Sequence, residues 1–287
     1  MILVTGAGGT VGSELLKQLR EQDAEVRAAF HSPEKAARAK SHGIDSVVLD
    51  FADRASIRAA LKGIDKLFLL GPTLPNQIEL ETNVVEEAKN AGVTHIVKLS
   101  VFDAGGEKYT FAKWHRAVEK IIERSGLTYT FLRPNGFMQN TLTYYLPTIK
   151  SDGAFYLPTK DSKEAAIDVR DIAAVAVQAL TASGHENKVY ELSGPEALTH
   201  EQIAQKLSAA AGRQIKYLDV PAAAFKQGAV GAGVPEAYAD ALLNLYQFYL
   251  TGGAAKVTND VERVTGKKPR SFDEFARDHA DAFKAAA

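Results

Sequence analysis

The sequence predicts an α/β protein with a doubly wound parallel sheet, followed by a smaller and mostly helical C-terminal lobe. Through the first half of the chain, short apolar segments alternate regularly with amphipathic helical segments. The apolar segments are hydrophobic at almost every position, which is typical of parallel strands that helices cover on both faces. A glycine-rich turn joins the first apolar segment to the first helical one, as expected at the start of a series of βαβ units.

The strand-like and helix-like segments follow one another in strict order. Parallel neighbours in a sheet need a crossover connection, so each helical segment between two strands predicts one such crossover. The predicted strands are 2–5, 25–30, 46–50, 66–70, 95–100 and 128–133, and the predicted helices are 10–21, 33–41, 55–61, 76–91 and 111–125.

The first strand ends in the turn Gly6-Ala-Gly-Gly-Thr-Val-Gly12, and a helical pattern begins at once. Such a turn exposes backbone N–H groups at the positive end of a helix, where a pyrophosphate can bind. The alternative is a tight turn without a ligand, but the strand–turn–helix context favours binding. The sequence therefore predicts a dinucleotide site made by Gly6, Gly8, Gly9, Thr10, Val11 and Gly12.

The end of the second strand indicates which dinucleotide binds. The segment Phe30-His31-Ser32 has no acidic residue that would bind the adenosine ribose hydroxyls of NAD. His31 and Lys35 are the nearest groups able to contact a 2′-phosphate, although a solvated helix face also explains Lys35. We therefore expect NADPH as the cofactor, with NADH as the alternative. Asp50 and Phe51, at the end of the third strand, are expected to border the adenine.

Beyond residue 150 the alternation weakens and helices dominate. Residues 165–182 end in an apolar helix, and Thr199 and Gln202 have the spacing of a capping box that opens a helix over 200–211. Glycine-rich joints separate the helices that follow. We expect a dinucleotide-binding domain over 1–150, to which 165–194 return, and a smaller substrate-binding lobe over 195–287.

Composition argues against several other functions. The chain has 287 residues, a net charge of −1 and no cysteine. Near-neutral charge gives no sign of nucleic-acid or anionic-membrane binding, and the lack of cysteine excludes disulfides and thiolate chemistry. No apolar run has membrane-spanning length, no signal peptide is recognisable, and the histidines have no metal-site spacing. We expect a cytoplasmic protein without a metal, either a monomer or a homodimer.

Three segments resemble a known family. The segments Trp114–Glu119, Ser125–Asn140 and Gly184–Ser193 are similar to the NmrA-like branch of the atypical short-chain dehydrogenases/reductases. Within that branch, the chain resembles the NAD(P)H quinone oxidoreductases and the triphenylmethane and azo dye reductases. The resemblance implies a Rossmann fold, a nicotinamide hydride donor and an aromatic electron acceptor. The family pattern has arginine where this chain has His31.

Two registers compete for the catalytic position on the helix that contains Glu119. Tyr109 and Lys113 have the YxxxK spelling, in which the tyrosine donates a proton and the lysine lowers its pKa from the same helix face. In extended relatives the active lysine precedes a glutamate by four residues, which is the place of His115 here. The dye and quinone reductases of the NmrA-like branch also carry histidine at this position. We therefore expect His115 to be catalytic, with Ser100 beside the nicotinamide or the substrate.

Further contacts are expected at the carboxyl side of the sheet, where ligands of this fold bind. The segment 133–140 ends the sixth strand there, and core packing is the alternative interpretation of its apolar side chains. The predicted cofactor contacts are Gly71, Pro72, Pro134 and Asn135, and the predicted substrate contacts are Phe102, Phe137 and Met138.

Without a tyrosine acid, hydride transfer suits acceptors that need little proton assistance, namely quinones and azo or triphenylmethane dyes. The protein would orient the reactants in a dry apolar pocket without a flavin. The product anion would take a proton from water or from His115. One alternative is a non-catalytic NADP-binding redox sensor of the NmrA type. Another is carbonyl reduction by Tyr109 and Lys113.

Overall fold

The computed structural model describes residues 1–284. Their contacts divide into two compact units, each assembled from separate stretches of the chain. The role of the second unit in substrate binding stays a prediction. Unit 1 comprises Met1–Gly105, Ala112–Arg133 and Val169–Tyr190, and unit 2 comprises Gly106–Phe111, Pro134–Asp168 and the chain from Glu191 onward.

The central sheet and its helices follow the alternation that the sequence predicts. The strands are β1 (Ile2–Val4), β2 (Val26–Phe30), β3 (Ser46–Val48), β4 (Lys66–Leu69), β5 (His95–Leu99), β6 (Thr128–Pro134) and β9 (Lys188–Leu192). The helices are α1 (Thr10–Arg20), α2 (Pro33–Ser41), α3 (Arg54–Ala60), α4 (Gln77–Asn90), α5 (Thr110–Ser125) and α7 (Val169–Thr181).

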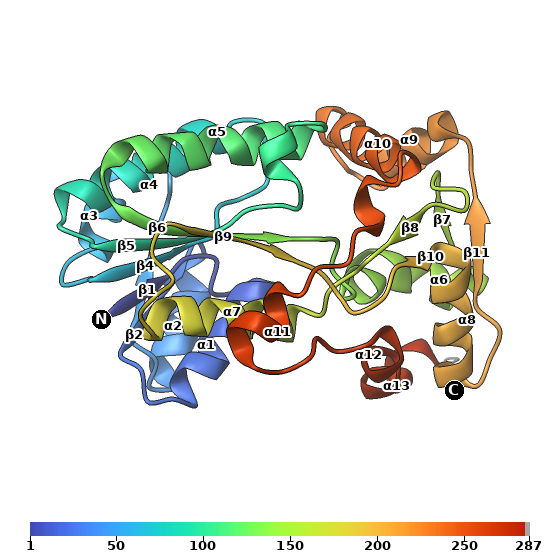
Figure 1. Ribbon diagram of the computed structural model, residues 1–287, viewed down its shortest axis with the longest axis horizontal. Helices are drawn as coiled ribbons and strands as arrows, with labels where there is room; N and C mark the ends of the chain where they lie inside the picture. The colour runs from blue at the N-terminus through green and yellow to red at the C-terminus, as the bar shows by residue number, and fades with distance from the viewer. Residues whose placement is uncertain (285–287) are drawn as a thin grey trace. The chain divides into compact units, whose positions relative to one another are not determined.

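The sheet has the strand order β3-β2-β1-β4-β5-β6-β9 (Figure 1). Adjacent strands from β3 to β6 are parallel. Figure 1 shows α3, α4 and α5 on one face of the sheet, and α1, α2 and α7 on the other. The predicted doubly wound Rossmann fold is therefore confirmed. The strand order reverses between β1 and β4, and such a switch point is where open α/β sheets bind their ligands.

The strands bury apolar side chains because helices cover both faces of the sheet. Leu3, Leu67, Ile96 and Phe131 lie in one core cluster together with helix residues such as Val84. This packing explains the continuous apolar runs in the sequence.

Unit 2 combines two small sheets with several helices. Strand β7 (Ala154–Leu157) pairs in parallel with β11 (Lys216–Asp219), and β8 (Lys163–Glu164) pairs antiparallel with β10 (Leu198–Thr199). The helices are α6 (Leu146–Asp152), α8 (His200–Ala211), α9 (Ala222–Gly231), α10 (Glu236–Leu250), α11 (Asp260–Thr265), α12 (Phe272–Asp278) and α13 (Ala280–Phe283).

Two features of unit 2 follow from local sequence. The capping box predicted at Thr199 and Gln202 is present, with both reciprocal hydrogen bonds at the start of α8. Aromatic rings fill the interior, including Tyr145 stacked on Phe155 with ring centroids 5.0 Å apart. Within residues 1–284, no helix combines the length and apolarity that a membrane crossing requires.

Candidate active site

The glycine-rich turn follows β1 at the switch point. Gly6 has a φ of +62°, which non-glycine residues rarely adopt. A Cβ on Gly12 would lie 2.2 Å from the carbonyl oxygen of Gly6, so glycine is required for α1 to pack against the turn. Gly9 is the N-cap of α1 and supplies no side-chain acceptor. The first N–H groups of the helix are therefore available to a phosphate.

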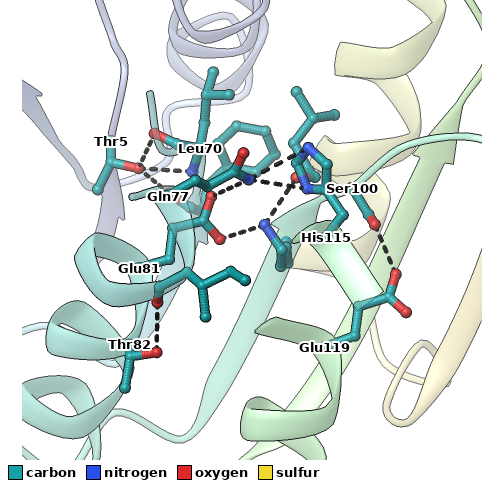
Figure 2. Close-up of polar contacts among 12 residues, drawn as sticks. Thr5, Leu70, Gln77, Glu81, Thr82, Ser100, His115 and Glu119 are labelled. Carbon is teal, nitrogen blue, oxygen red and sulfur yellow. Dashed lines mark hydrogen bonds and ion pairs between the residues drawn. The ribbon is translucent and has the colours of Figure 1, made fainter. Parts of the chain in front are cut away.

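Thr5 holds β1 and β4 together beside this turn. Its hydroxyl lies 3.0 Å from the carbonyl oxygens of Phe68 and Leu70 and accepts the N–H of Leu70 at 2.8 Å (Figure 2). Thr5 is not among the predicted site residues. Its polar side chain at the end of an apolar strand was the available signal.

The predicted adenosine contacts lie around α2 and the end of β3. A Cβ on Gly8 would lie 3.5 Å from Cδ of Lys35, so the stem of Lys35 runs beside the glycine turn. Lys35 and His31 are both exposed. Asp50 uses Oδ1 to accept the N–H of Ala52 at 2.9 Å, which fixes its carboxylate in a turn. The structure therefore brings Lys35 and Gly8 together.

His115 lies in a buried polar cluster that α4, β5 and α5 form together (Figure 2). Within it, Lys98 forms an ion pair with Glu81, and both side chains are fully buried. Gln77 donates to Oε1 of Glu81 at 3.0 Å, and the same amide nitrogen lies 3.3 Å from each ring nitrogen of His115. Because these two distances are equal, Gln77 does not select one tautomer of the imidazole.

The environment of His115 keeps its imidazole uncharged. Burial lowers the pKa of His115 well below its usual value, and the positive charge of Lys98 lowers it further. At neutral pH the ring therefore lacks the extra proton that an acid must give away. His115 is therefore a poor source of the proton that the product anion would take.

A second polar cluster surrounds Glu119, whose carboxylate is fully buried. Ser100 donates to it at 2.7 Å (Figure 2). Arg133 adds a bidentate pair at 2.9 and 2.6 Å, and Arg116 lies at 3.1 Å. These charge-assisted bonds offset the cost of burying the carboxylate. The bond from Ser100 also fixes the orientation of its hydroxyl.

The two catalytic registers have different surroundings. Tyr109 is buried in unit 2, where its ring packs on Phe248 with centroids 4.7 Å apart. Lys113 is exposed to solvent. His115, by contrast, is buried among polar partners at the carboxyl side of the sheet.

The segment after β6 is held by hydrogen bonds within unit 2. Asn135 donates its side-chain amide to the carbonyl of Ala254 at 2.8 Å and accepts the N–H of Gly136 at 2.9 Å. Phe137 forms a bridge with Ile167. The backbone N–H of Asn135 also donates to the carbonyl of Leu192 at 2.8 Å, so a cofactor contact there would use the carbonyl oxygen of Asn135.

Two of the three predicted substrate residues are closely packed. Met138 is 1% exposed and Phe102 is 4% exposed. Phe137 is only half-buried. Of these three side chains, Phe137 therefore has the most surface to offer a substrate, and core packing accounts for the burial of the others.

Sequence reasoning did not identify Gln77, Glu81, Lys98 or Arg133 as partners of the site. A lysine inside the apolar strand His95–Leu99 was the one clear signal, because a fully buried lysine needs a partner. The partner itself lies on α4, and only the fold brings it there.

Comparison with known proteins places the chain among nicotinamide-dependent reductases. Residues 1–276 match the NmrA-like family. The chain is 39% identical to an NAD(P)H azoreductase of Xenophilus azovorans over 287 residues, which cover 100% of both proteins. It is 33% identical to quinone oxidoreductase 2 of Escherichia coli over 84% of this chain and 85% of that protein.

Solved structures give the same result. The NADPH complex of an NADPH-dependent quinone oxidoreductase from Escherichia coli has a TM-score of 0.87 and 30% identity, covering 96% of this chain and 98% of that one. A triphenylmethane reductase of Citrobacter sp. complexed with NADP(H) has a TM-score of 0.85 and 27% identity, covering 97% and 99%. With its glycine turn, Rossmann sheet and matching sequence, the chain belongs to the NmrA-like family.

Proposed function

We propose that this chain is an NAD(P)H-dependent reductase that transfers a hydride to quinones or to azo or triphenylmethane dyes without a flavin. The observation that carries the proposal is the glycine turn at the switch point of the sheet. Relatives named as an azoreductase and a quinone oxidoreductase, together with structures containing NADPH or NADP(H), support it. The chain is thus an oxidoreductase with NADPH as its cofactor.

The residues of the adenosine half fit NADPH. The uncapped start of α1 would bind the pyrophosphate through backbone N–H groups. Lys35, whose stem runs beside Gly8, would contact the 2′-phosphate with its ammonium group. His31 would add a hydrogen bond, since a neutral imidazole carries no charge to pair with the phosphate.

The residues of the nicotinamide half lie after β4, β5 and β6. A Cβ on Gly71 would lie 2.5 Å from Oε1 of Glu81, so the backbone of this predicted cofactor residue touches the His115 cluster. Ser100, His115, Pro134 and the carbonyl oxygen of Asn135 would complete this half. NADPH supplies the hydride when bound. The protein contributes orientation and exclusion of water.

The acceptor is proposed to be a small aromatic molecule. We place the enzyme in the cytoplasm as a monomer or a homodimer, acting without nucleic acid or membrane. Light scattering of the purified chain would decide between the two assemblies. A stable larger oligomer would contradict this part of the proposal.

Anaerobic turnover of the purified protein tests the function directly. NADPH and then NADH would be supplied with a quinone, an azo dye and a triphenylmethane dye, following loss of the reduced nicotinamide. We expect turnover that is faster with NADPH, in protein whose visible spectrum shows no flavin. A flavin spectrum that accompanies all activity would contradict direct hydride transfer.

One observation favours a second candidate, an NADP-binding redox sensor of the NmrA type. Burial keeps His115 uncharged, so this histidine offers no ready proton. The same assay separates the candidates. Tight NADPH binding with no turnover of any acceptor would favour the sensor over the reductase.

A further inference from the structure

A buried carboxyl group in unit 2 lies outside both clusters described above. Glu164, at the end of β8, is 7% exposed. The hydroxyl of Tyr249 donates to its Oε1 at 2.7 Å, while Oε2 lies 3.7 Å from Nε2 of His200, beyond hydrogen-bonding distance. Within residues 1–284, no lysine or arginine forms an ion pair with this carboxyl. Glu164 is therefore a buried acid without a compensating cation.

The groups that face Glu164 are uncharged near neutral pH. Burial lowers the pKa of His200 to about 4, and burial raises the pKa values of Tyr145, Tyr246 and Tyr249. Burial also raises the pKa of the Glu164 carboxyl to about 7, against a smaller opposite effect of the Tyr249 hydrogen bond. An acid with such a pKa can give up and regain a proton at physiological pH.

The carboxyl lies against the segment that the sequence assigns to ligand contacts. A Cβ on Gly136 would lie 1.6 Å from Oε1 of Glu164 and 2.9 Å from the hydroxyl of Tyr249. Gly136 is flanked by Asn135, a predicted cofactor contact, and Phe137, a predicted substrate contact. The Ile167 N–H donates to the Gly136 carbonyl at 2.9 Å. The chain following β8 is thereby held beside this segment.

We propose that Glu164 is the acid that protonates the acceptor after hydride transfer. This inference rests on the proposed reductase function. In an azo dye, the hydride bonds to one nitrogen, the N=N π bond breaks, and its electron pair moves to the other nitrogen. That nitrogen takes the proton of the Glu164 carboxyl. The carboxylate that remains regains a proton from solvent. In a quinone, the electron pair ends on a carbonyl oxygen and takes the same proton.

The three acceptor classes differ in how much they need this acid. Hydride transfer to an azo dye creates a strongly basic nitrogen anion, and transfer to a quinone creates a weakly basic phenolate. A triphenylmethane dye is a cation, so hydride addition gives a neutral product that needs no proton. The need for Glu164 therefore decreases from azo dye to quinone to triphenylmethane dye.

The Glu164→Gln variant tests this order. Its amide still accepts the Tyr249 hydrogen bond but has no acidic proton. At saturating NADPH, we expect kcat for an azo dye to fall roughly 100-fold, kcat for a quinone to fall less, and kcat for a triphenylmethane dye to stay within about twofold. Glu164→Asp, which keeps an acid, should recover part of the azo activity. Equal losses with all three acceptors, or no loss with any, would overturn the proposal.

The pH profile gives an independent reading. In the wild type, kcat for the azo dye should fall as the pH rises through about 7, because the carboxyl loses its proton. This alkaline fall should be absent in Glu164→Gln. In Tyr249→Phe it should move to higher pH, because the lost hydrogen bond favours the carboxylate. An unchanged profile in both variants contradicts the assignment.

The controls separate this proposal from the function on which it rests. A wild type that binds NADPH but reduces none of the three acceptors removes the reductase function, and the role of Glu164 with it. A wild type that reduces all three, with a Glu164→Gln variant that does the same, removes only the role of Glu164. A wild type that reduces only the triphenylmethane dye also contradicts that role.

Discussion

At the scale of single residues, the cofactor half of the site depends on close contacts in and around the glycine turn. Gly12 lies against the Gly6 carbonyl, and the stem of Lys35 lies beside Gly8. The contact between Gly6 and Gly12 was predictable from the sequence because the two residues are close along the chain, whereas the contact between Gly8 and Lys35 depends on the fold. The buried Glu164 was not predictable, since its neighbours Asp161, Ser162 and Lys163 read as a solvated polar loop.

The substitution Gly12→Ala should damage both folding and cofactor binding. The added Cβ would lie 2.2 Å from the Gly6 carbonyl oxygen, so α1 or the turn must shift. Overpacking of this kind costs about 1–3 kcal/mol. Thermal unfolding and NADPH titration would measure the two effects. Gly228→Ala is the matched control, because a Cβ there meets nothing within 4 Å. Equal behaviour of the two variants would contradict the close-packing argument.

Lys35→Ala should weaken NADPH binding about tenfold, the low end expected for an exposed charge-assisted contact. NADH lacks the 2′-phosphate, so its affinity should not change. Titration of both cofactors measures the difference, with the exposed Lys40→Ala on the same helix as the control. His31→Arg should tighten NADPH binding, because arginine adds a permanent charge. If Lys35→Ala weakened both cofactors alike, the 2′-phosphate contact would be wrong.

At the scale of secondary-structure elements, the candidate site depends on the contacts that α4, β5 and α5 make at the carboxyl side of the sheet. Each element could be predicted from its own apolar pattern. Their polar contacts could not, because Gln77, Lys98 and His115 come from three separate elements and only the fold brings them together. The family resemblance singled out His115 by its spacing to Glu119, and the catalytic role of this residue stays a prediction.

The Lys98–Glu81 ion pair joins β5 to α4. Removing one of its two charges should destabilise the fold more than replacing both. Lys98→Met leaves the carboxylate of Glu81 buried without its cation, which should cost about 3–5 kcal/mol in the free energy of unfolding. The double variant with Glu81→Leu should recover much of that loss, since two apolar groups replace both charges. Chemical denaturation of the three proteins measures this. A double variant no more stable than Lys98→Met would contradict the argument.

At the scale of the whole molecule, the pH dependence of folding should reflect the acid of unit 2. The Glu164 carboxyl has a pKa of about 7 when folded and an ordinary value of 4.5. The folded state therefore holds this proton more tightly, so its contribution is fully present below pH 4.5 and is lost as the pH rises to 7. His200 acts in the opposite sense, with its contribution lost as the pH falls from 6.5 toward about 4.

The Glu164→Gln variant isolates the first contribution. The unfolding free energy of Glu164→Gln minus that of the wild type should increase by about 3 kcal/mol between about pH 4 and pH 8. The difference should level off above neutral pH. Denaturation midpoints of both proteins over a pH series would measure it. All other titrating groups cancel in the difference. A difference that does not vary with pH would mean that the folded carboxyl titrates normally.

The path of the chain between the two units has a consequence for protein engineering. The chain passes from one unit to the other after Gly105, Phe111, Arg133, Asp168 and Tyr190. Cutting the gene after codon 150 would remove α7 and β9, both of which belong to the sheet and its helices. Neither unit can therefore be expressed, exchanged or fused as one continuous module. Chimeras of related reductases would have to exchange several separate stretches of the chain at once.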